Sequence, residues 1–164
     1  MENQSPFIIS GLKLLRSLLL CLIIAMVGGW FTEPSLGGWF EGLEKPSFSP
    51  PGWLFPLIWT PLYILMGISL WFVWMVENPP HSRLWAASIF LIQLLLNLIW
   101  SPAFFFFECS FCGSLIILAL LVAIFLTIKA FFPFSKMAAY LLVPYFIWVV
   151  FAGILNISIF WMNL

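Results

Sequence analysis

Few side chains in this chain could do chemistry, and most of them lie inside long apolar segments. Gln93 and Asn97 are four residues apart, so they share one face of a helix. Asn156 lies in another apolar segment. Each amide could bond to a neighbouring helix, an interaction worth about 0.6 kcal/mol in a membrane. Each could also point into a cavity and orient an apolar ligand. The residue types alone are compatible with both roles.

Aromatic residues make up 20% of the sequence, and ten of them are tryptophans. Several tryptophans lie near the ends of apolar segments, where aromatic belts meet the membrane surface: Trp30, Trp39, Trp53, Trp85 and Trp161. Trp59, Trp100 and Trp148 lie deeper. A buried indole needs a partner for its N–H or a flat group against its ring. The three deep tryptophans therefore indicate a flat aromatic ligand.

Other kinds of chemistry find little support. The three cysteines are too few for a disulfide framework. Cys109 and Cys112 form a C-x-x-C, which could be a redox pair or half of a zinc site. There is no second C-x-x-C, and the single His81 lies in another loop, so we expect no metal site and expect small residues at a span boundary. No apolar segment has a carboxylate in its interior, which disfavours hydrolytic and ion-driven chemistry.

The composition is that of a membrane protein. Hydrophobic residues make up 64% of the chain and charged residues 7%, against about 45–50% and 25% in soluble domains. Six basic residues balance six acidic ones, which leaves no excess charge for binding a nucleic acid. The lipid bilayer is therefore the expected environment, and nucleic acid is not an expected partner.

Apolar runs without polar alternation predict helices rather than barrel strands. We expect an all-α integral membrane protein, a bundle of five transmembrane helices in a single domain over residues 1–164. The predicted spans are 12–31, 53–76, 84–107, 111–132 and 137–162. Short links predict that consecutive spans pack side by side. The exception is Thr32 to Gly52, a long first loop rich in aromatic residues, which we expect to fold back as a lid.

Basic residues predict the orientation, because lysine and arginine near span ends favour the cytoplasm. Five of the six fall on one side of the predicted topology: Lys13, Arg16, Arg83, Lys129 and Lys136. Only Lys45 falls on the other. We therefore expect a cytoplasmic N-terminus and a C-terminus outside.

Four spaced motifs identify the chain as similar to the TspO/MBR family, the translocator proteins once called peripheral benzodiazepine receptors. They are GLEKPSFSPPGW from Gly42 to Trp53, W-x-x-x-Y-x-x-M-G from Trp59 to Gly67, Q-x-x-x-N-x-x-W-x-P from Gln93 to Pro102, and P-Y-x-x-W-x-x-F-A-x-x-L-N from Pro144 to Asn156. Several motifs in the right order are far more specific than one. The resemblance covers nearly the whole chain.

The resemblance implies a five-helix bundle, usually a homodimer, whose first loop covers a pocket. Members bind tetrapyrroles such as protoporphyrin IX, synthetic isoquinoline and benzodiazepine ligands, and in many cases sterols. The matching pocket residues here are Phe40, Pro50, Trp59, Tyr63, Asn97, Trp100, Trp148, Ala152 and Leu155. Small residues that could bring helices of a dimer together are Gly67 with Ala103 or Gly113.

The expected function is binding of a porphyrin-type tetrapyrrole for transport, sensing or disposal. One alternative is a photo-oxidative porphyrin-degrading enzyme, in which Trp59 and Trp148 would be the catalytic residues and no dedicated cofactor would be needed. Another is a structural or regulatory membrane partner. Two departures from the family stand out. Phe48 replaces a usual tryptophan, and the closing LNISIFWMNL lacks the tyrosine and arginine of sterol-binding members.

Overall fold

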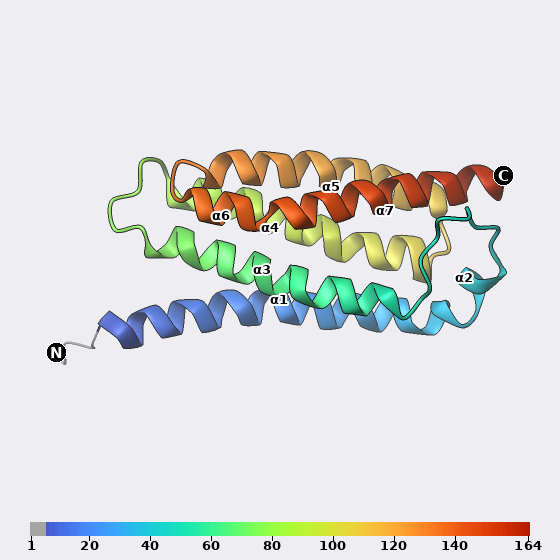
Figure 1. Ribbon diagram of the computed structural model, residues 1–164, viewed down its shortest axis with the longest axis horizontal. Coiled ribbons are helices and arrows are strands. Elements are labelled where there is room, and N and C mark those ends of the chain that lie inside the picture. The colour runs from blue at the N-terminus through green and yellow to red at the C-terminus, as the bar shows by residue number, and fades with distance from the viewer. Residues whose placement is uncertain (1–5) are drawn as a thin grey trace.

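The chain forms a bundle of five long helices in a computed structural model that describes residues 6–164, and this described part contains no strand (Figure 1). The helices are α1 (Pro6–Leu36), α2 (Trp39–Gly42), α3 (Leu54–Met75), α4 (Arg83–Ser101), the π-helix η1 (Pro102–Phe106), α5 (Ser110–Phe131), α6 (Lys136–Leu141) and α7 (Val143–Met162). Five of these segments are long and apolar enough to cross a membrane, so the predicted five-span helical architecture is confirmed. The N- and C-termini lie at opposite ends of the bundle.

Helix α1 is longer than the predicted span of residues 12–31, because it continues to Leu36. The beginning of the expected first loop is therefore helical. Thr32 donates a hydrogen bond to the carbonyl of Gly28 at 2.9 Å, and its hydroxyl lies 2.6 Å from that of Ser101 in α4. Ser101 also donates to the Gly28 carbonyl, at 2.9 Å. These bonds fasten the end of α1 to α4, and the lid is correspondingly shorter.

The order of helices around the bundle differs from the prediction that consecutive spans pack side by side. That prediction is correct for α4 with α5 and for α5 with α7. It is wrong for α3 and α4, which scarcely touch because α1 packs against both of them. The link at residues 76–82 joins α3 and α4 at the end of the bundle where α1 begins. The side of α3 away from α1 packs mainly on the short helix α6.

Prolines shape the helices where they interrupt the backbone hydrogen bonds. Pro102 has no N–H to donate to the carbonyl four residues earlier. The chain widens there into η1, where the N–H of Phe107 donates to the Pro102 carbonyl at 2.9 Å. Pro144 likewise follows the break at Leu142 between α6 and α7. Pro61 lies within α3. The free backbone groups are tolerated because neighbouring helices surround them.

The small residues that we considered for a dimer are used inside this chain. A Cβ at Gly67 would lie 3.0 Å from Leu18 Cα and 3.2 Å from the Ser17 carbonyl, so Gly67 lets α3 approach α1 closely. A Cβ at Gly113 would lie 3.0 Å from Asn156 Oδ1. Gly67 and Gly113 therefore serve close contacts within this chain, and the expected homodimer rests on the family likeness alone.

We expect Gly67→Ala to destabilise the bundle. The added methyl group would meet backbone atoms of α1, and such overpacking costs about 1–3 kcal/mol. The free energy of unfolding in mild detergent measures the effect. Gly29→Ala in α1 is the matched control, because a Cβ there has nothing within 4 Å. A control variant that is destabilised as much as Gly67→Ala would contradict the assignment of a close α1–α3 contact.

Candidate functional site

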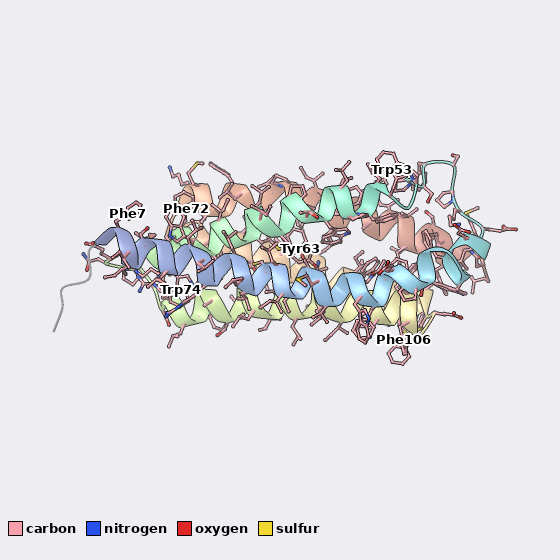
Figure 2. The ribbon with its side chains drawn as sticks, turned by 90° about the horizontal axis from the view of Figure 1, so that it is seen from below. Phe7, Trp53, Tyr63, Phe72, Trp74 and Phe106 are labelled. Atoms are coloured by element: carbon pink, nitrogen blue, oxygen red, sulfur yellow. A yellow bond between two sulfur atoms is a disulfide. The ribbon has the colours of Figure 1, made fainter. Side chains whose placement is uncertain are left out.

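A buried hydrogen-bonded group joins three helices at mid-length of the bundle, where Figure 2 shows Tyr63. The Tyr63 hydroxyl on α3 donates to Asn97 Oδ1 on α4. Asn97 Nδ2 in turn donates to the Tyr145 hydroxyl on α7, at 3.0 Å. All three residues are buried. Asn97 therefore bonds across helices, which is one of its two predicted roles. Its other predicted role, orienting a ligand, stays a prediction.

An aromatic cavity lies between this polar group and the end of the bundle that carries the C-terminus. The cavity is lined by Phe40, Phe55, Trp100, Phe104, Phe105, Ala152, Leu155, Asn156 and Ile159. Its volume is about 20 Å³, which is room for about one water molecule. Phe40 from α2 is one of the lining rings, 5.6 Å from Phe105 and 6.1 Å from Phe104. The cavity is thus narrowed by aromatic rings of the chain itself.

The structure brings most of the predicted site residues to this region, in two groups. Phe40, Trp100, Ala152 and Leu155 line the cavity. Tyr63 and Asn97 belong to the polar group below it. The remaining three predicted residues do not line the cavity: Pro50, Trp59 and Trp148.

Trp59 and Trp148 pack in different aromatic groups. The Trp59 ring lies 5.6 Å from Tyr63 and 6.1 Å from Tyr145. The Trp148 ring lies 6.3 Å from Phe55 and 5.2 Å from Phe151. Pro50, the third residue outside the cavity lining, is half-buried in the loop before α3. Trp59 therefore flanks the polar group, and Trp148 flanks the cavity.

Phe104 and Phe105 are site residues that the sequence motifs do not predict. Both side chains are buried, and both residues lie in the π-helix that follows Pro102. Trp100 stacks on Phe104 with ring centroids 5.5 Å apart and planes 12° apart. The available signal was the run of four phenylalanines after Pro102 within an otherwise helical pattern.

Two hydrogen bonds attach the lid to the end of α7. The backbone N–H of Glu44 donates to Asn163 Oδ1 at 3.0 Å, and Asn163 Nδ2 donates to the Glu44 carbonyl at 2.9 Å. Lys45 places its ammonium 4.8 Å from the centre of the Phe40 ring. The Phe48 ring lies 6.3 Å from Phe151 and is half-exposed. The lid is thus held by one side chain at its edge and by aromatic contacts beneath it.

Several buried polar atoms around the site have no hydrogen-bond partner among residues 6–164. They are the indole N–H groups of Trp100 and Trp148, Asn156 Oδ1, and both amide atoms of Gln93. An unpaired polar group buried in a protein costs about 1–3 kcal/mol. Two of these donors and one acceptor belong to residues that line or flank the aromatic cavity. The site therefore offers hydrogen bonds that the chain does not use.

A disulfide joins Cys109 and Cys112 at the start of α5, so the expectation that these are merely small boundary residues is wrong. The turn before α5 places their Cα atoms 5.2 Å apart, which is within the usual range for a disulfide. The residues beside it also contact the site. Asn156 donates to the Ser110 carbonyl at 3.0 Å and to the Ser114 hydroxyl at 2.6 Å. The bridge thus borders the cavity through Asn156.

Comparisons with known proteins agree with the motifs. Residues 17–162 match the profile of the TspO/MBR family. The "Tryptophan-rich protein TspO" of Archaeoglobus fulgidus is 42% identical over 93% of this chain and 97% of its own length. The "Translocator protein" of Homo sapiens is 34% identical over 79% and 78%, respectively. The "Tryptophan-rich sensory protein" of Cereibacter sphaeroides is 33% identical over 76% and 77%.

We expect Asn163→Ala to loosen the lid without unfolding the bundle. The variant loses both hydrogen bonds to Glu44, each worth about 0.5–1.5 kcal/mol. Amide hydrogen exchange of residues 43–49 should therefore become roughly tenfold faster. Ser158→Ala is the control, because the Ser158 hydroxyl bonds only within α7, to the Ile154 carbonyl. Unchanged exchange of the lid in Asn163→Ala would show that the aromatic contacts alone hold it.

Proposed function

Because this chain belongs to the TspO/MBR family, we propose that its aromatic site binds a flat, apolar tetrapyrrole of the protoporphyrin IX type, for transport, sensing or disposal. The observation that carries the proposal is the pair of buried indole N–H groups without a partner, on Trp100 and Trp148, beside a cavity lined by aromatic rings. Sites for small apolar ligands combine apolar walls with a few oriented polar groups.

The chemistry of the ligand matches these groups. A porphyrin has two broad apolar faces, which stack on indole and phenyl rings. Protoporphyrin IX also carries two carboxylates at one edge, which accept hydrogen bonds. The indole N–H groups of Trp100 and Trp148 would donate to such acceptors. A ligand that pairs these donors removes the cost of burying them unpaired.

Binding requires the site to open, because a cavity of about 20 Å³ is far smaller than a tetrapyrrole. Phe40 is the group whose displacement would create most room, since its ring lies between Phe55, Phe104 and Phe105. Phe40 belongs to the lid, which is attached at its edge by Asn163. We infer that the ligand enters when the lid lifts and withdraws Phe40.

We also propose that the lid faces outward, with the N-terminus in the cytoplasm and the C-terminus outside. Five basic residues fall at the end of the bundle that carries the N-terminus: Lys13, Arg16, Arg83, Lys129 and Lys136. The disulfide lies at the opposite end, with the lid. Basic ends favour the cytoplasm, and disulfides persist in oxidising compartments outside it. The two features support the same orientation independently.

Reporter fusions at the C-terminus test this orientation in a bacterial host. We expect an alkaline phosphatase fused to the C-terminus to be active, because that enzyme folds only in an oxidising compartment. A fluorescent protein fused at the same point should be dark, because it does not fold when it is exported unfolded. The same reporters fused to the end of α3, after Met75, should behave oppositely, because that point lies at the basic end. An active phosphatase after Met75 and an inactive one at the C-terminus would reverse the assignment.

Titration of the purified protein with protoporphyrin IX, followed by the porphyrin absorption band, tests the ligand. Trp59→Phe combined with Trp148→Phe should weaken binding by roughly tenfold, because phenylalanine offers a smaller ring for stacking and Trp148→Phe removes an N–H donor whose hydrogen bond contributes about 0.5–1.5 kcal/mol. The control combines Trp30→Phe with Trp161→Phe, since these indoles are 70% and 68% exposed. Equal loss of affinity in both double variants would place the porphyrin on the surface rather than in the site.

A further inference from the structure

A second and larger cavity lies at the opposite end of the bundle, away from the aromatic site. Its volume is about 350 Å³, in the range of ligand pockets. It lies between three helices: α1 contributes Lys13, Arg16, Ser17 and Leu20, α3 contributes Leu70 and Trp74, and α4 contributes Ala87, Phe90 and Leu91. Figure 2 shows Trp74 near the end of the bundle that carries the N-terminus. The proposed tetrapyrrole function uses none of these residues.

The polar part of this cavity is cationic. Lys13 and Arg16 are three residues apart, so they share one face of α1. The Lys13 ammonium donates to the Trp74 carbonyl at the end of α3, at 3.1 Å, which holds the charge across the cavity mouth. An ammonium has three donors, so two remain for a ligand. Within the part of the chain that the structure describes, the cavity lining includes no acidic residue.

A third cation lies beside Trp74 without lining the cavity. The Arg83 guanidinium lies 5.8 Å from the centre of the Trp74 ring and donates to the Val76 carbonyl. The cavity thus has two lining cations from α1 and one neighbouring cation from the start of α4.

The cavity becomes apolar with depth. Leu20 is seven residues beyond Lys13, which places it about 10 Å further along α1. At that depth the walls are Leu20, Leu70 and Phe90. Leu91, which also lines the cavity, is 48% exposed on the outer surface of α4. The cavity therefore borders the outer surface between α1 and α4, with the Lys13 charge near the end of α3.

We propose that this cavity binds one anionic glycerophospholipid, with its phosphate at Lys13 and Arg16 and the upper part of an acyl chain against Leu20, Leu70 and Phe90. Basic residues near helix ends commonly reach toward lipid headgroups. Basic residues can attract headgroups without any cavity. Here a cavity between three helices lies beside them, and this cavity gives room for a single lipid. A free inorganic anion would leave the apolar walls without a partner.

Native mass spectrometry of the whole protein in mild detergent tests the proposal, with dioleoyl phosphatidylglycerol and dioleoyl phosphatidylcholine as probes of equal chain length. We expect one phosphatidylglycerol to bind roughly tenfold more tightly than phosphatidylcholine. Lys13→Gln combined with Arg16→Gln should abolish this preference. Ala87→Leu, which fills the cavity and keeps both cations, should lower the amount of bound phosphatidylglycerol.

The matched control is Lys129→Gln combined with Lys136→Gln, which removes two basic residues that do not line the cavity. It should keep the preference for phosphatidylglycerol. An equal loss in the control would show general surface attraction and overturn the proposal. Equal binding of the two lipids by the wild-type protein would also overturn the proposal, and this comparison needs no variant. If inorganic phosphate raises the melting temperature as much as phosphatidylglycerol does, the cavity takes a free anion and the lipid assignment is wrong.

Discussion

The hydrogen bonds of Asn97 connect three helices at mid-length of the bundle. The backbone of α3 approaches those of α4 and α7 at few points, and α3 meets α7 mainly through side chains such as Trp59. Asn97 bridges this gap, because it accepts from Tyr63 on α3 and donates to Tyr145 on α7. In lipid, association of helices gains little from the hydrophobic effect, so close packing and interhelical hydrogen bonds carry more of the stability. Elsewhere the close α1–α3 contact at Gly67 supplies the packing. Asn97 supplies the connection across the middle, directly below the aromatic cavity.

The aromatic site includes a local break in the α-helical hydrogen bonds, at the point where α4 is followed by η1. Pro102 cannot continue the α-helical hydrogen bonds, and the π-helix that follows it carries the buried Phe104 and Phe105. The Phe105 carbonyl accepts from Ser35 of α1 at 2.8 Å, so a neighbouring helix supports the altered backbone. Trp100 stacks on Phe104, and Phe40 packs on both phenylalanines. One backbone irregularity thus creates the wall on which the lid closes.

The sequence predicts the features that follow from a lipid environment and from the pattern of apolar and polar residues along each segment. Long apolar runs are sufficient for the five helices, because each span must satisfy its own backbone in lipid. The buried position of Asn97 is also predictable, since an amide in a span needs a partner. The separation of α3 from α4 by α1 is not predictable from the sequence. Lipid and protein interior are equally apolar, so an apolar helix face does not indicate which neighbour it packs against. The inward turn of Phe105 depends on the register after Pro102, and the disulfide depends on the turn at residue 108, where Glu108 has a φ of 52°.

The aromatic site has donors that no group of the described chain uses. The indole N–H groups of Trp100 and Trp148 are buried without a partner among residues 6–164, and a hydrogen bond to each would contribute about 0.5–1.5 kcal/mol. The lid contributes opposing terms of similar size through Asn163 and the Phe40 contacts. Opening the lid therefore sacrifices a few weak contacts, and a ligand with acceptors at its edge recovers the pairing that the closed site lacks. On the proposal that a ligand binds here, its hydrogen bonds and the lid contacts that it replaces are therefore of similar size.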